Sequence, residues 1–244
     1  MRLTVLGTGC PIPDPQRTQS GYLLEKSGKL MLIDCGSGVL AQLARLGVDW
    51  EHLDTFLITH HHLDHLSDLL PLFTARWLMG FPRATVYGPA GTQEFISQMM
   101  APFSYVKDHV SLQVQEIKAG AVHSIAGFEV SAFTMRHFVT SLAYKFDRTL
   151  VICGDSEPLP ELREFVQDCK LVLHECSLPN GYQAPGHTTP TALGQALAGA
   201  KIDWLLLTHF YPEAATRIPE MLDAVRKHFH GRVSAATELQ SIEL

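Results

Sequence analysis

Four histidines and an aspartate fall within six consecutive positions of this sequence, in the stretch THHHLDH at residues 59–65. Side chains two residues apart in an extended chain project to the same side, so His60 and His62 can reach one ion. Asp64 and His65 come at the approach to a helix and can project together toward a second point. Imidazole and carboxylate groups bind zinc, or manganese and iron as substitutes. The stretch therefore predicts a metal site, with a histidine-rich surface loop as the alternative.

Three later residues could complete such a site, because four clustered donors are too few to saturate two ions. His137 ends the segment FEVSAFTMRH, Asp155 ends TLVICGD, and His209 ends DWLLLTH. Each is a ligand-type residue just past an expected strand, where a polar side chain can face a shared site from a rigid support. One histidine in such a place is more often a surface residue, but the three together with the cluster indicate a metal centre.

The rest of the chain alternates between strand and helix patterns that would carry these side chains. Alternation and short apolar runs predict strands at residues 2–8, 55–59, 84–89, 170–176 and 203–210, hairpins at 21–36 and 142–155, and an antiparallel meander at 110–137. Helical spacing predicts helices at residues 37–47, 66–80, 91–100, 160–169, 189–200 and 218–231. Gly47 is placed to end the first helix, and Thr189 and Pro190 to begin the fifth. We expect one α/β domain over residues 1–244, with helices outside packed sheets.

Composition narrows the class of protein. The chain has 244 residues, 46% of them hydrophobic, which is enough for a substantial core, and it has no run of 18 apolar residues. The start MRLTVLGTG lacks the features of a signal peptide, so we expect no membrane anchor and a cytoplasmic protein. The net charge of −6 argues against broad nucleic-acid binding. Five cysteines without a C-x-x-C pair predict neither a disulfide framework nor a cysteine zinc knuckle.

The sequence also resembles a known family. THHHLDH fits the pattern H-x-H-x-D-H, the signature of the metallo-β-lactamase superfamily, and the resemblance covers nearly the whole chain. LIDCG is similar to the early Asp-x-Gly motif, where Asp34 would brace the metal loop. His137, Asp155 and His209 match the later ligand motifs in order. The resemblance implies a hydrolase with an αββα sandwich of two mixed sheets, outer helices, and metals at one edge of the sheets.

The same resemblance implies how the ligands are shared between two divalent ions. His60, His62 and His137 would hold one ion, Asp64, His65 and His209 the other, and Asp155 would bridge both together with a water or hydroxide. Zinc is the expected metal, with manganese or iron as substitutes. His61 occupies a variable position of the motif and is not expected to bind metal.

Further motifs are similar to one branch of that superfamily, which holds phosphodiesterases and tRNA 3′-processing enzymes of the ribonuclease Z type. LGTGCPIPDPQR resembles its opening loop, and LVLHECSL followed by GHTTPTALG resembles its His-Glu and Gly-His-Ser/Thr motifs. By this resemblance, His187 would contact the substrate phosphate, and Glu175 would orient His187. A carboxylate on one ring nitrogen fixes the tautomer, and the imidazolium can then stabilise phosphoryl charge or protonate a leaving oxygen. A buried His–Glu pair that only packs is the alternative.

The short interval between His137 and Asp155, two expected ligands, affects which substrate is expected. Seventeen residues, 138–154, separate His137 from Asp155, and a short hairpin fills them. Relatives with a flexible tRNA-binding arm insert it in this interval, so the resemblance points to a short form without the arm. We therefore expect a small or cyclic phosphodiester as the partner, ahead of tRNA, and a homodimer of the kind common among relatives.

The expected reaction is attack of a hydroxide, activated between the two ions, on phosphorus. Asp64 would serve as ligand and proton acceptor, and His187 would assist the leaving group. Three other interpretations stay open: a tRNA 3′ endonuclease without the arm, a thioesterase, lactonase or other carbonyl hydrolase of the same fold, and a metal-bound scaffold without activity. The His-Glu and Gly-His-Thr motifs argue against the second, and the full ligand set argues against the third.

Overall fold

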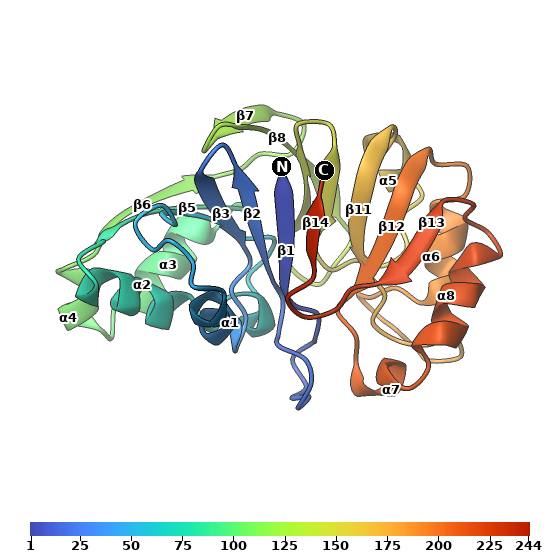
Figure 1. Ribbon diagram of the computed structural model, residues 1–244, viewed down its shortest axis with the longest axis horizontal. Helices are drawn as coiled ribbons and strands as arrows, with labels where there is room; N and C mark the ends of the chain where they lie inside the picture. The colour runs from blue at the N-terminus through green and yellow to red at the C-terminus, as the bar shows by residue number, and fades with distance from the viewer.

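Two seven-stranded sheets lie face to face in the computed structural model, which describes residues 1–244, and helices cover the outer face of each sheet (Figure 1). This arrangement is the αββα sandwich of two mixed sheets that the sequence resemblance implied, so the predicted fold class is confirmed. The two chain ends lie side by side on β1 and β14, where the N-terminal amine of Met1 donates a hydrogen bond to the carbonyl oxygen of Leu244 (3.2 Å).

The first sheet is antiparallel at one side and parallel at the other. In spatial order its strands are β14 (Ser241–Glu243), β1 (Arg2–Gly7), β2 (Gly21–Lys26), β3 (Lys29–Ile33), β4 (Thr55–Leu57), β5 (Arg83–Gly88) and β6 (Ser111–Glu116). The strands from β14 to β3 pair antiparallel. Those from β3 to β6 pair parallel, because a helical crossover precedes each new strand.

The second sheet repeats this plan, with antiparallel strands first along the chain and parallel strands after them. In spatial order its strands are β13 (Arg232–Ala235), β12 (Ile202–Thr208), β11 (Cys169–Glu175), β10 (Leu150–Cys153), β9 (Ser141–Phe146), β8 (Phe128–Met135) and β7 (Val122–Ile125). The strands from β13 to β10 pair parallel through helical crossovers. Those from β10 to β7 pair antiparallel.

The antiparallel meander predicted over residues 110–137 is wrong in one strand. β6 lies in the first sheet and pairs parallel with β5, whereas β7 and β8 form an antiparallel hairpin in the second sheet. Alternation of polar and apolar residues indicates that one face of a strand is buried. It does not indicate which strand pairs with it. The chain therefore crosses from one sheet to the other between Glu116 and Val122, which the pattern did not reveal.

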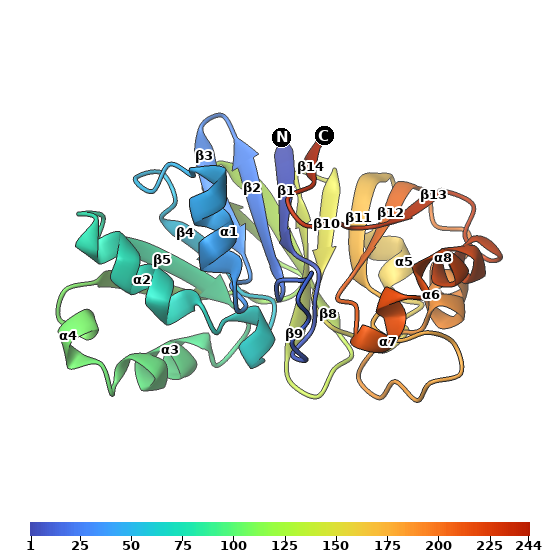
Figure 2. The same ribbon diagram turned by 60° about the horizontal axis from the view of Figure 1, so that its bottom comes forward.

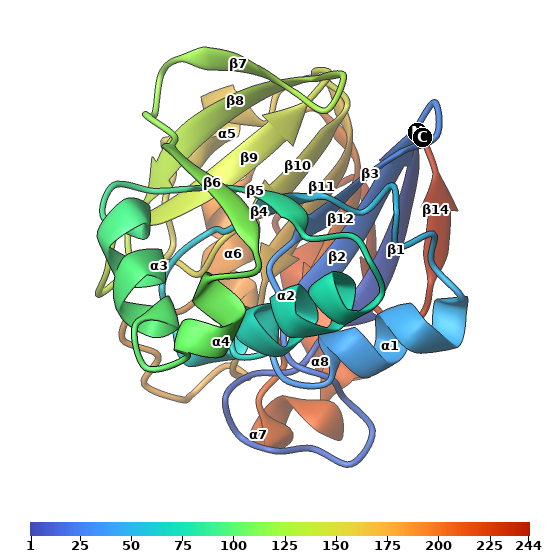
Figure 3. The same ribbon diagram turned by 90° about the vertical axis from the view of Figure 1, so that its left-hand side faces the viewer.

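Four helices lie beside each sheet, those of the first half facing the viewer in Figure 3. They are α1 (Val39–Leu46), α2 (Leu69–Leu78), α3 (Thr92–Met100) and α4 (Ser104–Lys107), then α5 (Leu162–Phe165), α6 (Pro190–Ala196), α7 (Pro212–Ala215) and α8 (Ile218–Arg226). None is long and apolar enough to cross a membrane. Gly47 ends α1 with a φ of 61°, as expected, and Thr189 precedes α6, although its side chain makes no capping hydrogen bond. The helix predicted at residues 160–169 is a single turn, because Asp168 takes a φ of 59° and β11 begins directly after it.

Apolar side chains fill the space between all of these layers. Leu24 and Leu57 of the first sheet pack in one cluster with Ile152 of the second. Outside the first sheet, Phe56 of β4 meets Phe73 of α2 edge to face, with ring centroids 5.5 Å apart. Each fully buried side chain of this size contributes about 1.5–3 kcal/mol. The sandwich is therefore held by its apolar layers, which leaves its edges free to carry polar groups.

The five cysteines behave as small apolar residues. All are free and buried: Cys10, Cys35, Cys153, Cys169 and Cys176. Burial raises the pKa of every one of these thiols above its ordinary value, so each is neutral near pH 7. This agrees with the expectation from their number and spacing.

The carboxyl ends of several strands meet at one edge of the sandwich. β8 runs antiparallel to β9, and β9 to β10, so β8, β10, β11 and β12 point the same way. In the first sheet β1, β3 and β4 share a direction. Loops after these strands gather in the lower part of Figure 2. Beyond β12, Phe210 N donates to Thr8 O (2.8 Å), beyond β1, and so joins the two sheets. Residues that end these strands therefore meet although they lie far apart in sequence.

Candidate metal centre

The histidine-rich loop leaves β4 in an extended conformation. His62 has extended backbone angles (φ −86°, ψ 147°), so His60 and His62 project to one side, as expected. The single 3-10 turn η1 (Leu63–His65) follows and carries Asp64 and His65, both of which are buried. The loop thus presents two pairs of ligand-type side chains from one short segment.

The strand-end residues reach the same place from the second sheet. His137 lies just beyond β8, Asp155 beyond β10 and His209 beyond β12. His209 has a φ of 60°, and Asp34, beyond β3, has a φ of 56°. Non-glycine residues in such backbone regions carry strain of about 1–3 kcal/mol, and they cluster at functional sites. Both residues belong to the centre described here.

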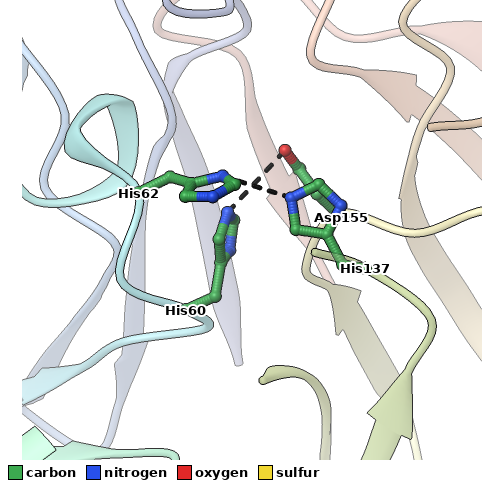
Figure 4. Close-up of side chains that lie close together, drawn as sticks. All are labelled: His60, His62, His137 and Asp155. Atoms are coloured by element: carbon green, nitrogen blue, oxygen red, sulfur yellow. Dashed lines mark hydrogen bonds and ion pairs between the residues drawn. The ribbon is translucent and has the colours of Figure 1, made fainter. Parts of the chain in front are cut away.

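Four side chains form the first group (Figure 4). His60, His62, His137 and Asp155 have ligand atoms that all lie within 4.8 Å of one another. His62 Nδ1 is 3.1 Å from His137 Nε2, and His60 Nε2 is 3.8 Å from Asp155 Oδ2. One carboxylate therefore faces three imidazoles that the two halves of the chain supply.

A second group shares that carboxylate. Asp64, His65, Asp155 and His209 also have ligand atoms within 4.8 Å of one another. His209 Nε2 is 3.1 Å from Asp64 Oδ2 and 3.3 Å from Asp155 Oδ2, and His65 Nε2 is 3.5 Å from Asp155 Oδ2. The structure thus brings together all seven expected ligands, in the division that the sequence resemblance implied.

Four of the five imidazoles are oriented by a partner outside the centre. The contacts are His60 Nδ1 to Thr59 Oγ1 (3.0 Å), His65 Nδ1 to Asp34 Oδ2 (2.7 Å), His137 Nδ1 to Gly186 O (2.6 Å) and His209 Nδ1 to Ser177 Oγ (3.0 Å). A carbonyl and an ionised carboxylate can only accept, and each of the two hydroxyls gives its own proton to a carboxylate. Each Nδ1 is therefore the donor, and each Nε2 is directed inward, where it can bind a metal ion.

This donor set fits metal ions. His60 Nε2 is buried and has no hydrogen-bond partner, an arrangement that costs about 1–3 kcal/mol unless another group binds the nitrogen. Burial lowers the pKa of His60, His62 and His137 below the ordinary value, so these rings are neutral near pH 7. Neutral imidazoles with carboxylates and no thiolate suit zinc and other first-row divalent metals. Two groups sharing one carboxylate are consistent with a binuclear site.

Two residues hold charge at the middle of the centre. Burial by itself would raise the pKa of Asp155, but His209 and His65 hold it well below its usual range. Burial by itself would lower the pKa of His65, but the charges of Asp155 and Asp34 raise it well above its usual value. The Nε2 lone pair of His65 can therefore hold a proton or a metal ion, and the two compete.

The Asp-x-Gly motif braces the metal loop, as predicted. Asp34 Oδ1 accepts a hydrogen bond from Thr59 N (2.8 Å), and its Oδ2 accepts from Thr59 Oγ1 (2.9 Å) and from His65. Two residues later, Gly36 lies so close to the loop that an added Cβ would overlap the carbonyl oxygen of Asp64. The motif thus fixes the loop through a carboxylate and through close packing of its backbone.

A second buried carboxylate serves the other side of the centre. Glu175 Oε1 is 3.3 Å from His187 Nδ1, the pairing that the sequence predicted. Its Oε2 accepts from Ser177 Oγ (2.8 Å), and Ser177 Oγ in turn accepts from His209. Thr188 N also donates to Oε1 (2.9 Å). Glu175 therefore supports both His187 and, through Ser177, one of the ligand-type histidines.

His187 lies between the centre and solvent. Its Nδ1 is 3.8 Å from Asp155 Oδ2, and its Nε2 is 3.4 Å from Tyr211 Oη. Burial alone would lower the pKa of His187, but the hydrogen bond and charge of Glu175, together with Asp155 and Asp64, raise it above the ordinary value. The ring is therefore protonated over more of the neutral range than a free histidine.

The residues that orient the rings were not predicted from the sequence. Ser177, Thr59 and Gly186 were not singled out, although each binds the Nδ1 of a ligand-type histidine. A signal was present for two of them, since Thr59 directly precedes His60 and Ser177 lies two residues after Glu175. Gly186 carried no such signal, because it acts through its backbone carbonyl.

The middle histidine of the loop lies outside both groups. His61 Nε2 is 2.8 Å from Thr92 Oγ1, and Thr92 gives its own proton to Pro89 O (2.6 Å). The His61 ring stacks on Phe95 with centroids 5.0 Å apart and planes 4° from parallel. His61 therefore ties the metal loop to α3 and faces away from the two groups.

A two-sheet sandwich whose edge carries two His/Asp groups around one shared carboxylate defines a metal-dependent hydrolase of the metallo-β-lactamase fold. The chain belongs to the family described as Anti-Pycsar protein Apyc1, whose model matches residues 1–223. The matched range includes every residue of both groups together with Glu175 and His187.

Similar proteins extend over the whole chain. Ribonuclease Z of Mycobacterium marinum is 27% identical over an alignment that covers 100% of this chain and 99% of that protein. The metallo-β-lactamase fold protein YhfI of Bacillus subtilis superposes with a TM-score of 0.85 at 24% identity, covering 99% of this chain and 98% of its own. Human tRNase Z, short form (ELAC1), gives 0.77 at 23% identity over 100% and 99%. Zn(2+)-bound PqqB of Methylobacterium extorquens gives 0.74 at 16% identity over 100% of both chains. At these identities the structures establish the fold.

Ser177→Ala tests the orientation of His209. The substitution removes the acceptor of the His209 Nδ1 proton, so we expect a loss of metal affinity of about 10–100-fold. Titration of metal-free protein with zinc against a competing chelator measures it. Ser141→Ala is the matched control, because Ser141 is equally buried and its hydroxyl has no hydrogen-bond partner. Equal affinities for wild type and Ser177→Ala would contradict the role of Ser177.

Metal loading should release protons near pH 7. The pKa of His65 is raised well above its ordinary value in the metal-free chain, so the proton is present at neutral pH and must leave when a metal ion takes Nε2. Metal affinity should therefore rise as pH increases from 6 toward the raised pKa. Calorimetric titrations at one pH, in two buffers of different ionisation enthalpy, count the protons released. Identical heats in both buffers would exclude this competition.

Proposed function

We propose that this protein is a phosphodiesterase that hydrolyses a cyclic nucleotide with the help of two divalent metal ions. The observation that carries this proposal is the position of His187. Its ring lies beside Asp155, the carboxylate common to both groups, and Glu175 holds its Nδ1. The His187 side chain is 13% exposed, whereas those of His60, His65 and His209 are almost completely buried. A protonated imidazole is thus available to a substrate that reaches the centre.

Seven residues would hold the metal ions. His60, His62 and His137 would bind one, Asp64, His65 and His209 the other, and Asp155 would bind both. Zinc suits this donor set, with manganese or iron as substitutes, and the fold neighbour PqqB was solved with Zn(2+). When bound, two such ions lower the pKa of a water and neutralise charge on phosphoryl oxygens.

Asp64 is placed to move a proton at the centre. Burial alone would raise its pKa, but the hydrogen bond and charge of His209, with the charge of His65, lower it. The carboxylate is therefore ionised at neutral pH. Its Oδ2 faces His209 Nε2 at 3.1 Å and His65 Nε2 at 3.6 Å, so a proton taken from an attacking water stays within the second group. Asp64 would accordingly serve as both ligand and proton acceptor.

His187 is placed to receive the departing oxygen. Glu175 accepts the Nδ1 proton, which leaves Nε2–H as the donor toward a substrate. The raised pKa of His187 favours the charged form of this donor. An imidazolium in that position stabilises negative phosphate oxygens and can give its proton to the alcohol that leaves. A phosphodiester carries negative charge on two non-bridging oxygens, whereas thioester and lactone hydrolysis develops charge on a single carbonyl oxygen. A charged donor at this position therefore favours the phosphodiester over a carbonyl substrate.

Three features support a small cyclic substrate. The Apyc1 family is one of cyclic nucleotide phosphodiesterases. The interval between His137 and Asp155 holds only the hairpin of β9 and β10, with no inserted arm. The net charge of −6 does not favour a long polyanion. A compact phosphodiester that fits between the loops of the edge agrees with all three.

A tRNA 3′ endonuclease is the second candidate, because ribonuclease Z of M. marinum is similar over the full chain. A precursor tRNA would need phosphate contacts over a wide basic surface, and its binding would weaken steeply with salt. The acidic chain would then depend on a partner subunit for those contacts.

A substrate panel tests the proposed function. Zinc-loaded protein should hydrolyse 3′,5′-cyclic nucleotides faster, by kcat/KM, than bis(p-nitrophenyl) phosphate, and it should not turn over thioesters or lactones. Precursor tRNA should remain intact at physiological salt. Preference for precursor tRNA would establish the second candidate, and turnover of only the carbonyl substrates would overturn the phosphodiesterase assignment.

Two substitutions separate metal binding from catalysis. Asp155→Ala removes the carboxylate common to both groups, so we expect metal content and activity to fall together. His187→Ala should keep both metals by elemental analysis yet lower kcat by about 10²–10⁴-fold, the usual contribution of a general acid. An unchanged rate of cyclic nucleotide hydrolysis in His187→Ala would show that His187 has no role in the reaction.

A further inference from the structure

The rim of the metal centre carries an exposed aromatic ring that the reaction described above does not use. Phe138 directly follows His137 in the loop between β8 and β9, and 69% of it is exposed. Burial of a phenylalanine side chain stabilises a protein by about 1.5–3 kcal/mol. Phe138 lacks this stabilisation because its ring is exposed beside the buried metal ligands. A bound molecule can therefore cover the ring.

The exposed ring packs against the backbone on one side. Phe138 rests on Gly186, where an added Cβ would lie 2.5 Å from Phe138 Cε2 and 2.9 Å from Cδ2. Gly186 has a φ of 75°, a backbone region that favours glycine, and its carbonyl accepts the His137 Nδ1 hydrogen bond (2.6 Å). Gly186 therefore contacts the Phe138 ring and, through its carbonyl oxygen, orients His137.

The ring stands next to the residues that would act on phosphate. Its centroid is 5.3 Å from that of His137, with planes at 49°. Gly186 directly precedes His187, so the seat of the ring and the proposed proton donor belong to one segment. Leu63, in the loop after His62, and Val139 are further exposed apolar side chains beside the expected ligands. A molecule whose phosphate lies at His187 can therefore rest its apolar part on Phe138.

We infer that Phe138 is the surface on which the nucleobase of the substrate stacks, which makes it a specificity-determining residue. This inference rests on the proposed function, because it requires a phosphodiester that carries a base. Stacking of a base on an aromatic side chain is worth about 1–3 kcal/mol and tolerates any base, since every base has a π face. Phe138 thus selects base-bearing over base-free phosphodiesters and discriminates little among bases.

The experiment compares two probes that share one phosphodiester. A 3′,5′-cyclic nucleotide carries the base, and the 3′,5′-cyclic phosphate of methyl riboside lacks it. In zinc-loaded protein, Phe138→Ala should raise KM for the cyclic nucleotide roughly tenfold, which corresponds to about 1.4 kcal/mol, with kcat within about twofold. The base-free probe should show no change in kcat/KM. Phe138→Trp should restore the wild-type KM, because the larger ring also stacks.

Phe103→Ala is the matched control, since Phe103 is an exposed phenylalanine that lies beside α4 and away from the ligands. It should leave both probes unaffected. Equal losses on the two probes in Phe138→Ala would show that the ring supports the centre and contacts no base, and unchanged kinetics would show that it contacts nothing. Either result overturns the inference while wild-type turnover of cyclic nucleotide upholds the proposed function. If the wild-type protein neither cleaves the cyclic nucleotide nor binds it by calorimetry, both fail.

Discussion

The structure depends on the convergence of buried imidazole lone pairs at the seam between two sheets. Such an arrangement is favoured when the second nitrogen of a ring gives its proton to a fixed acceptor, as in four of the five rings, and when a cation can occupy the middle. Asp34 provides for this in the first half of the chain, directly for His65 and through Thr59 for His60. Glu175 does so in the second half, through Ser177 for His209. Two buried carboxylates, one in each half, thus orient three of the five imidazoles.

Burial of the apolar layers stabilises the fold and offsets the free-energy cost of the buried polar groups at this edge. Clusters between the sheets and beneath the helices hold the strands in register, so the loops after them are fixed at their bases. The left-handed backbone of Asp34 and His209 is maintained by that surrounding structure. Because the two groups draw on both sheets, a bound metal ion would also link the two halves and stabilise the folded state by mass action.

Chemical tasks are divided among neighbouring segments of the edge. The shared carboxylate Asp155 and its ligand-type neighbours form the part that would hold metal ions, while His187 adds a proton donor at the border with solvent. Phe138 lies closer to solvent and packs against Gly186, the residue that precedes His187. The expected metal ligands are therefore mostly buried, while the ring proposed to stack on the base is exposed beside them.

Much of the centre could be predicted from the sequence, because its residues are local or mark the ends of apolar strands. The spacing in THHHLDH and the positions of His137, Asp155 and His209 indicated all seven ligand-type residues, and alternation and helical spacing indicated most elements. Only the tertiary structure decided that β6 joins the first sheet, that Ser177 and Gly186 orient the rings, and that Phe138 is exposed on a glycine seat. Ligand type and periodicity could be predicted because each depends only on a short stretch of chain. Strand partners, backbone acceptors and the exposure of one ring depend instead on which distant segments pack together.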